Sequence, residues 1–128
     1  MTPDELAERL EHVAGQVQKR MEQAVRHAAQ LGQARIQGNA SGRPGPNVIT
    51  GAYRGSWRTE TSSIRGGAKA TIGTNAPQAR RLEFGFVGAD SRGRVYNQPP
   101  FPHVQPALGY IEQTLHGQVR LAVAVMLS

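Results

Sequence analysis

The histidines are among the side chains of this sequence best suited to catalysis or metal binding. They are His12, His27, His103 and His116. Zinc sites need ligands at short, characteristic spacings, and none of these histidines has a neighbour at such a spacing. The sequence contains no cysteine, which excludes disulfides, thiolate metal sites and a cysteine nucleophile. We therefore expect no resident metal and no other cofactor.

Carboxylates are sparse beyond the first 38 residues. They are Glu60, Glu83, Asp90 and Glu112. Glu83 stands apart because the apolar residues Leu82 and Phe84 flank it. The basic pair Arg80 and Arg81 comes just before this group. The context fits a buried or interfacial ion-pair partner, and it fits equally well an outward-facing residue of an alternating strand.

The glycine-rich stretches do not match phosphate-binding loops. GNASGRPGP, residues 38–46, lacks the Gly-Lys-Ser/Thr ending of such a loop and has no strand before it. GADSRGRVY, residues 88–96, lacks the glycine spacing of a dinucleotide-binding turn. No Gly-x-Ser-x-Gly nucleophile turn is present either. We therefore expect the protein not to be an enzyme.

The net charge of +6 is concentrated in the middle of the chain. Residues 39–106 carry nine basic and three acidic side chains, whereas the charges on either side of this segment cancel. Eight of the nine are arginines, whose planar guanidinium suits phosphate and carboxylate groups. The pattern fits either an ordinary solvated surface or a surface that faces nucleic acid or an acidic partner.

Aromatic residues lie among these arginines. They are Tyr53, Trp57, Phe84, Phe86, Tyr96 and Phe101. Proteins that bind single-stranded nucleic acid use the same mixture, but a small hydrophobic core needs a similar number of aromatic side chains. No recognition helix, zinc finger or RNP motif is present, so sequence-specific binding is not expected. A small basic protein that binds nucleic acid without specificity remains the alternative function.

The first thirty residues predict a long amphipathic helix. Thr2 can cap it, Pro3 suits its first position, and Glu5 completes a capping box. Apolar residues recur at intervals of three and four: Leu6, Leu10, Val13, Val17, Met21, Ala24, Ala28 and Leu31. Thirty helical residues extend about 45 Å, which is long for so small a chain. We expect this helix to pack along an equally long element or against a neighbouring subunit.

Turn-forming residues separate this helix from the middle of the chain. Residues 38–51, GNASGRPGPNVITG, contain four glycines and two prolines, so they predict a loop. Thr50 can cap a short turn that ends at Gly55. SWRTETSSI and AKATIGT, which follow, alternate as two strands joined by a turn at RGG. APQARRLEF, residues 76–84, fits either a helical turn or the start of a strand.

The last segment predicts a second amphipathic helix, opened by Pro106. Its apolar stripe is Val104, Leu108, Ile111, Leu115, Val119, Ala122 and Met126. Strands grouped between two terminal helices indicate the α+β class. We expect a long N-terminal helix, a small antiparallel β-sheet and a C-terminal helix packed on the sheet. A chain of 128 residues fits one domain, residues 1–128, with flexible loops at about 38–50 and 86–99.

No segment has the character of a targeting or membrane-spanning sequence. The start, MTPDELAERL, is acidic and periodic, unlike a signal peptide. The longest apolar run, residues 121–127, is far shorter than the roughly 20 residues that a membrane span requires. We expect no association with a membrane.

Three short motifs occur in a fixed order: TGAYRGSW at 50–57, ATIGTNAPQARRLEFGF at 70–86 and QPPFPHVQPAL at 98–108. In this order they resemble the head–tail joining, or tail-completion, proteins of long-tailed bacteriophages and prophages. The resemblance covers roughly residues 1–125. Two positions depart from the family pattern, Gln78 where an aromatic residue is usual and His103 where a basic residue is common.

The resemblance implies a virion structural protein that is assembled in the host cytoplasm. It would form a ring, a hexamer, at the phage neck. One face would meet the head-side connector, and the other would meet the tail tube or tail terminator. Genome DNA would pass through the lumen without sequence specificity.

The resemblance also implies roles for the residues from 79 onward. Residues 82–86 would build the sheet and place Glu83 at a subunit contact, and residues 87–98 would form a mobile basic arm. Arg80 and Arg81 would pair with acidic residues of neighbouring rings, and Arg54 and Arg58 would face DNA in the lumen. The full set of interface residues would be Arg80, Arg81, Glu83, Phe84, Phe86, Arg92, Arg94, Tyr96 and Phe101.

Overall fold

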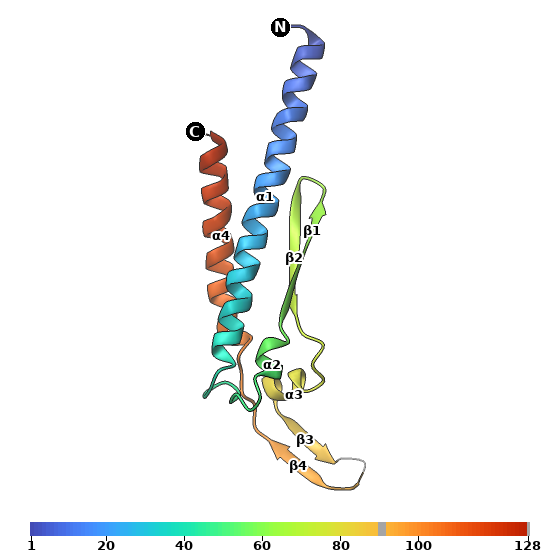
Figure 1. Ribbon diagram of the computed structural model, residues 1–128, viewed down its shortest axis with the longest axis vertical. Helices are drawn as coiled ribbons and strands as arrows, with labels where there is room; N and C mark the ends of the chain where they lie inside the picture. The colour runs from blue at the N-terminus through green and yellow to red at the C-terminus, as the bar shows by residue number, and fades with distance from the viewer. Residues whose placement is uncertain (90–91, 128) are drawn as a thin grey trace.

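The structure is a computed structural model that describes residues 1–89 and 92–127, and it is elongated (Figure 1). In chain order its elements are α1 (Pro3–Asn39), α2 (Ala52–Gly55), β1 (Arg58–Ile64), β2 (Gly67–Gly73), α3 (Ala79–Phe84), β3 (Phe86–Ala89), β4 (Val95–Gln98) and α4 (Gln105–Leu127). Long helices at the two ends enclose short antiparallel strands, which confirms the α+β class.

The start of α1 confirms the capping box predicted from the sequence. The Thr2 hydroxyl accepts a hydrogen bond from the backbone N–H of Glu5 at 3.1 Å. The Glu5 carboxylate in turn accepts one from the backbone N–H of Thr2 at 3.1 Å. The helix then continues through 37 residues to Asn39, or about 55 Å at the helical rise. It is therefore longer than the thirty residues that the apolar periodicity predicts.

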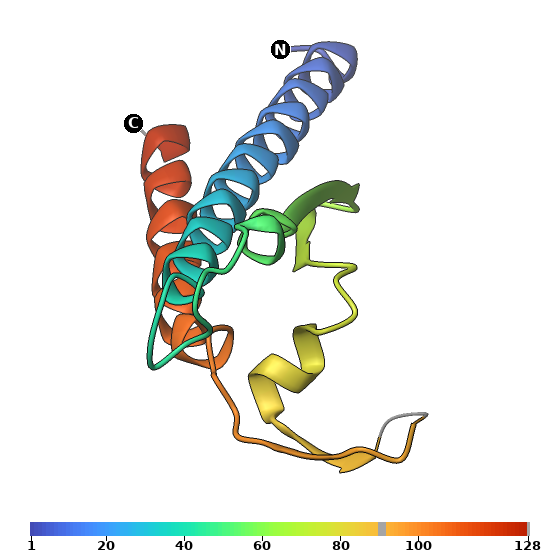
Figure 2. The ribbon, with the colours of Figure 1, turned by 60° about the horizontal axis from the view of Figure 1, so that its bottom comes forward.

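The second half of α1 lies between α4 on one side and the β1–β2 hairpin on the other (Figures 1 and 2). Small side chains allow this close packing, because Ala28 and Gly32 are buried. A Cβ added at Gly32 would stand 2.9 Å from Cγ1 of Ile111 in α4 and 2.9 Å from Cδ1 of Ile72 in β2. The sequence predicts that the last helix packs on the sheet. In the structure α4 packs mainly along α1, and it comes near β2 beside Gly32.

The strands form two separate hairpins. β1 and β2 pair antiparallel from Arg58 opposite Gly73 to Ile64 opposite Gly67, as the alternating sequence predicts. Gly66 takes a φ of +75° in the turn between them, a conformation that favours glycine. β3 and β4 pair antiparallel in a second sheet, with Phe86 opposite Gln98.

The expectation that residues 82–86 build the sheet is wrong for the first three of them, which belong to α3. Ala, Arg and Leu favour the helix, and Gly85 ends it with a φ of +81°. The N–H of Gly85 donates to the carbonyl of Arg81 at 2.8 Å. A Cβ at Gly85 would also stand only 2.8 Å from the carbonyl oxygen of Gln98, so this turn requires glycine. The strand begins only afterwards, at Phe86.

The core is small and lies at the C-terminal end of α1. Its buried members are Ile36, Trp57 and Ala107, and Tyr53, Ile72, Val104 and Ile111 pack against them. These residues come from α1, α2, β2 and the start of α4, together with the positions beside those elements. This end of the molecule therefore brings together residues from all three short motifs of the sequence.

Candidate functional site

Glu83 is a buried carboxylate that caps the start of α4. It is 8% exposed. Its Oε2 accepts hydrogen bonds from the backbone N–H groups of His103 at 2.8 Å and Val104 at 3.0 Å, and Oε1 accepts one from Gln105 at 2.9 Å. The N–H groups of Val104 and Gln105 are among those that the first turn of a helix leaves without partners, and His103 comes just before them. The structure thus decides between the two readings of Glu83, because the side chain points inward.

The hydrogen bonds keep this buried carboxylate charged. Burial on its own raises the pKa of the Glu83 carboxyl. The backbone N–H groups of Val104, Gln105 and His103, with a smaller effect from the His103 ring, outweigh it and hold the pKa below its ordinary value of 4.5. The negative charge also lies at the positive end of the α4 dipole. The hydrogen-bond partners of Glu83 therefore all belong to its own chain, and its burial needs no neighbouring subunit.

His103 connects this carboxylate to Tyr53. The imidazole is fully buried, and its Nδ1 lies 3.0 Å from Glu83 Oε2 and 2.9 Å from the carbonyl oxygen of Phe101. Since both neighbours are acceptors, Nδ1 carries a hydrogen. Nε2 lies 2.5 Å from the Tyr53 hydroxyl, and in the neutral ring it accepts the hydroxyl hydrogen. The Asn39 amide at the end of α1 donates to the carbonyl of His103 at 3.1 Å.

The order of carboxylate, imidazole and hydroxyl is also that of a hydrolase triad. Here the hydroxyl belongs to Tyr53, and burial followed by the charge of Glu83 raises the pKa of Tyr53 to about 12. The imidazole of His103 is fully buried, so it has no open side from which a substrate could approach. The arrangement instead joins α1, α2, α3 and α4 at one point, and we call these residues, Asn39, Tyr53, Glu83 and His103, the polar clamp.

The two rings of the clamp pack against each other and against Trp57. The rings of Tyr53 and His103 meet edge to face with centroids 5.5 Å apart, and Trp57 lies 5.9 Å from His103 and 6.3 Å from Tyr53 in the same manner. Trp57 is buried. Edge-to-face pairs of this kind add to the stability that burial of the rings supplies. The three rings and the clamp thus pack as one cluster.

The β3–β4 hairpin leaves the body of the molecule as an arm (Figures 1 and 2). Val87 and Val95 on this arm are 77% and 80% exposed, and Phe84 at its base is 75% exposed. Arg81 lies with its guanidinium 3.9 Å from the centre of the Phe86 ring. At the stem, the N–H of Phe101 donates to the carbonyl of Leu82 at 2.6 Å. The arm therefore presents apolar side chains to solvent from a fixed base.

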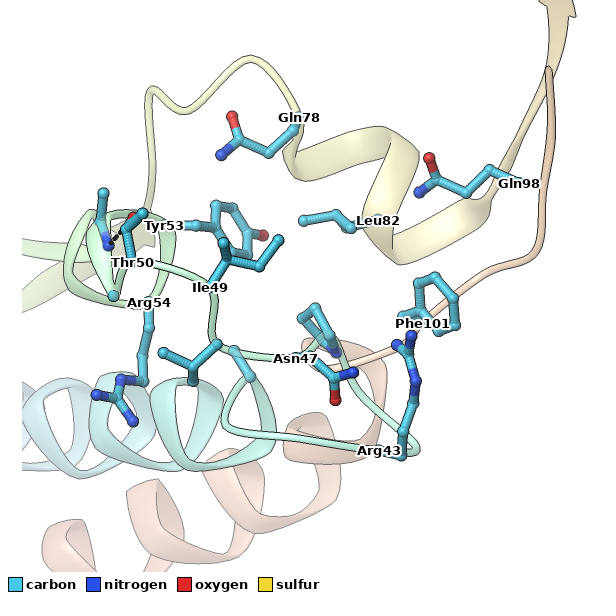
Figure 3. A pocket seen from close by; sticks show the side chains of 15 residues that line it. Arg43, Asn47, Ile49, Thr50, Tyr53, Arg54, Gln78, Leu82, Gln98 and Phe101 are labelled. Atoms are coloured by element: carbon cyan, nitrogen blue, oxygen red, sulfur yellow. Dashed lines mark hydrogen bonds between the residues drawn. The ribbon is translucent and has the colours of Figure 1, made fainter. Parts of the chain in front are cut away.

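A groove of about 650 Å³ lies beside the clamp. Residues from the loop after α1, from α2, from α3 and from the stem of the arm line it. Figure 3 shows Ile49, Tyr53 and Leu82 turned toward the same space. Arg43 stands at the edge with its guanidinium 3.7 Å from the centre of the Phe101 ring. The groove has mainly apolar walls and a basic edge.

The residues that the sequence groups as interface lie on α3, on the arm and on its stem, and they differ in exposure. Arg80 is exposed on α3, whereas Phe86 and Phe101 are half-buried beneath guanidinium groups. Arg92 and Arg94 are exposed in the arm. The backbone of Tyr96 belongs to β4, but its side chain lies outside the described part of the structure, as does Asp90.

The two arginines expected at a DNA-facing lumen both bind the backbone or a neighbouring hydroxyl. Arg54 donates to Ser41 Oγ at 3.2 Å. Arg58 donates from Nη1 to the carbonyl oxygens of Gly55 at 2.5 Å and Trp57 at 2.9 Å. Both side chains are exposed, and these hydrogen bonds hold them at the surface. Arg54 also lines the groove.

Residues 1–89 and 92–127 hold neither a cluster of metal ligands nor a helix suited to cross a membrane. Within these ranges, no three histidine, aspartate or glutamate side chains gather closely enough to hold a metal ion. No helix within them combines the length and the apolar character that a membrane crossing demands.

The residues before α4 contain a signal for the clamp. No Ser, Thr, Asp or Asn stands at residues 103–105, just before or at the start of α4, although such residues usually cap a helix. A helix start without a local cap requires acceptors from elsewhere. Glu83, set among apolar residues, is the acceptor that the fold supplies.

Comparison with known proteins bears on these surfaces. Residues 4–85 match the model of the HK97-gp10-like family, described as "Bacteriophage HK97-gp10, putative tail-component". The match contains α1, α2, both strands of the first hairpin, and α3 with Glu83. No curated protein and no solved structure matches the chain.

Proposed function

The chain belongs to the HK97-gp10-like family of bacteriophage tail components, and from that premise we propose that it is the neck protein that joins head to tail. Membership makes it a structural protein of the phage virion. In the proposed role, copies of the chain form a ring, a hexamer, between the head-side connector and the tail tube or tail terminator. Genome DNA passes through the lumen of the ring. The protein acts through binding surfaces and catalyses no reaction.

The observation that carries this proposal is the exposed arm. Val87, Val95 and Phe84 present large apolar surfaces to solvent, although a chain of this size could have buried them. Exposed apolar groups next to arginines are typical of a surface that contacts protein, where arginine and aromatic residues are enriched. The arm projects from the body, so it can reach a neighbouring copy or the next ring (Figure 1).

The clamp supports the same role. Residues of the arm lie between α3 and α4, and Glu83 closes this segment by binding the backbone at His103 and Val104. The base of the arm is thereby fixed to the helices, so a contact made by the arm positions the whole subunit. In this proposal Arg80 and Arg81 meet acidic groups of a neighbouring ring, which charge reversal at both positions tests. Intact ring formation and tail joining after that reversal would contradict the pairing.

Non-specific binding of nucleic acid is the second candidate. The positive charge of residues 39–106 favours it, and the exposed side chains of Arg54 and Arg58 could contact phosphates. A free binding protein would hold duplex DNA tightly at low salt and release it at high salt. A ring that conducts DNA would instead interact with it weakly and without sequence preference.

Light scattering on the purified protein separates the two candidates. The native mass is measured at low and high salt, first alone and then with added duplex DNA. Self-association or association with a neck partner, unaffected by DNA, supports the neck protein. A monomer that binds DNA at low salt and leaves it at high salt would replace the neck role by the nucleic-acid role.

A further inference from the structure

The first turns of α1 carry an apolar stripe that no part of the chain within residues 1–89 and 92–127 covers. Leu6, Leu10 and Val13 are 48%, 61% and 53% exposed. These turns extend beyond the end of α4 and beyond the β1–β2 turn (Figure 1). Farther along the same helix the stripe is covered, since Ala24 and Ala28 are 5% and 2% exposed. The start of α1 thus has the face of a packed helix without the element that would pack on it.

The spacing of this stripe suits a groove. Leu6, Leu10 and Val13 stand at positions i, i+4 and i+7, which are the anchors of an amphipathic helix bound in a hydrophobic groove. The groove beside the clamp presents matching apolar walls. Val48 and Ile49 on those walls are 40% and 94% exposed. Its volume of about 650 Å³ is within the range of pockets that enclose a small ligand, so it can receive several side chains.

The charges of the two surfaces are complementary. The first thirteen residues carry four carboxylates, Asp4, Glu5, Glu8 and Glu11, against the single basic side chain of Arg9. The groove is lined by Arg43 and Arg54, and none of the described residues that line it is acidic. An acidic helix is therefore attracted to this groove, whereas a basic partner is repelled.

We propose that the start of α1, residues 4–13, of one copy docks into the groove of the next copy. The groove includes Ala40, directly after the end of α1, so helix start and groove are separated by nearly the full length of α1, about 55 Å. A helix of this length cannot fold back onto its own end. The contact must therefore join two molecules.

The proposed contact is heterologous, because it joins two different surfaces of the same chain. Repetition of such a contact generates a closed ring when the rotation between copies closes, and an open filament when it does not. The inference rests on the proposed function in this respect, since it specifies how copies of the neck ring meet. Arg54 then faces a neighbouring subunit, and Arg58 remains the arginine available to DNA. Docking also covers Tyr53, which lines the groove and belongs to the clamp.

Cysteine cross-linking tests the contact directly, because the chain contains no cysteine of its own. One variant carries Leu10→Cys and a second carries Ile49→Cys, and the two are mixed and mildly oxidised. We expect a disulfide-linked dimer of the two variants. The matched control replaces Leu10→Cys by Gly15→Cys, which lies on the opposite face of α1 in open space. The control pair should give a several-fold lower yield of dimer.

A second measurement tests the charge complementarity. Arg43→Glu and Arg54→Glu together, placed in the Ile49→Cys chain, should lower the yield several-fold. Arg26→Glu, an exposed change on α1 away from the groove, should leave it unchanged. An unchanged yield after reversal at the groove would overturn the proposal.

The outcomes separate failure of this contact from failure of the neck role. In one outcome, light scattering detects oligomers, but the test and control pairs give equal yields of disulfide-linked dimer. The copies would then meet elsewhere, through the arm, or another virion protein would fill the groove. The neck role would then stand and the proposed contact would fall. Absence of both cross-linking and self-association, with tight binding of duplex DNA, would overturn both.

Discussion

Glu83 and His103 meet through a single oxygen atom across a separation of 20 positions. Oε2 of Glu83 lies 2.8 Å from the backbone nitrogen of His103 and 3.0 Å from its Nδ1. One carboxylate therefore fixes both the backbone and the ring of this residue. Because the arm lies between these two positions, the same contact closes the segment from which the arm extends.

Glu83→Gln should destabilise the protein by about 2 kcal/mol at neutral pH, because the amide provides one acceptor and places a donor against backbone N–H groups. The folded pKa of Glu83 is lowered, so its contribution is fully present above the ordinary value of 4.5 and is lost as pH falls through the lower folded value. The difference in unfolding free energy between the variant and the parent should therefore shrink in acid. Urea unfolding at several pH values measures it.

The exposed Glu60→Gln in β1 is the control for this change. It should alter the unfolding free energy by no more than about 0.5 kcal/mol. If Glu83→Gln cost the same at pH 3 as at pH 7, the charge of Glu83 would have no part in the cap.

Tyr53→Phe removes the hydroxyl that binds His103 and keeps the ring. We expect a loss of about 1 kcal/mol, the usual net value of one hydrogen bond, which lowers Tm by roughly 4 °C. Tyr110→Phe provides the comparison, since Phe retains the face on which Arg35 lies, 5.1 Å from the ring centre. Equal melting temperatures of the two variants would show that the bond to His103 contributes nothing.

Gly32→Ala and Gly15→Ala test how closely α1 packs. Alanine at the exposed Gly15 should add up to about 1 kcal/mol of stability, because it is the better helix former and meets no atom within 4 Å. At Gly32 the new methyl would meet Ile111 and Ile72 at 2.9 Å, and overpacking of this kind costs about 1–3 kcal/mol. Chemical denaturation of the two variants should place Gly32→Ala clearly below Gly15→Ala. The reverse order would show that α4 and β2 do not press on α1.

Val87→Asp in the arm should leave stability nearly unchanged, because this side chain is 77% exposed. It should weaken association between copies or with neck partners, since a charge replaces an apolar contact. Sedimentation of the variant alone and with tail proteins measures the effect. Ser62→Asp, on the exposed side of β1, is a comparable change on the other hairpin and should associate as the parent does. Identical behaviour of both variants would remove the arm from the interface.

The sequence predicts those elements that are determined by residues close together in the chain. The capping box of Thr2 and Glu5, the turn at Gly66 and the alternation of β1 and β2 each depend on residues within a few positions of one another. Thr50 also behaves as predicted, because its hydroxyl accepts a hydrogen bond from the N–H of Ala52 at 3.2 Å. Periodicity likewise finds α1 and α4.

Features that depend on distant partners cannot be predicted from local sequence patterns. The sequence leaves residues 76–84 open between a helical turn and a strand, and the close approach of Gly85 to Gln98 fixes where α3 ends. The role of Glu83 depends on backbone groups 20 or more positions away. Periodicity also cannot reveal what covers an apolar stripe, so the exposure of Leu10 and the burial of Ala28 on one helix become visible only in the structure.

The stem of the arm determines where a mechanical load on the protein would go. A pull on β3 and β4 reaches the body through α3 and through residues 99–104, which the Phe101–Leu82 hydrogen bond and the carboxylate of Glu83 tie together. Such a load acts on the hydrogen bonds at the stem of the arm. It does not act directly on the side chains that pack between α1 and α4. Under tension these hydrogen bonds would therefore break before the two long helices separate.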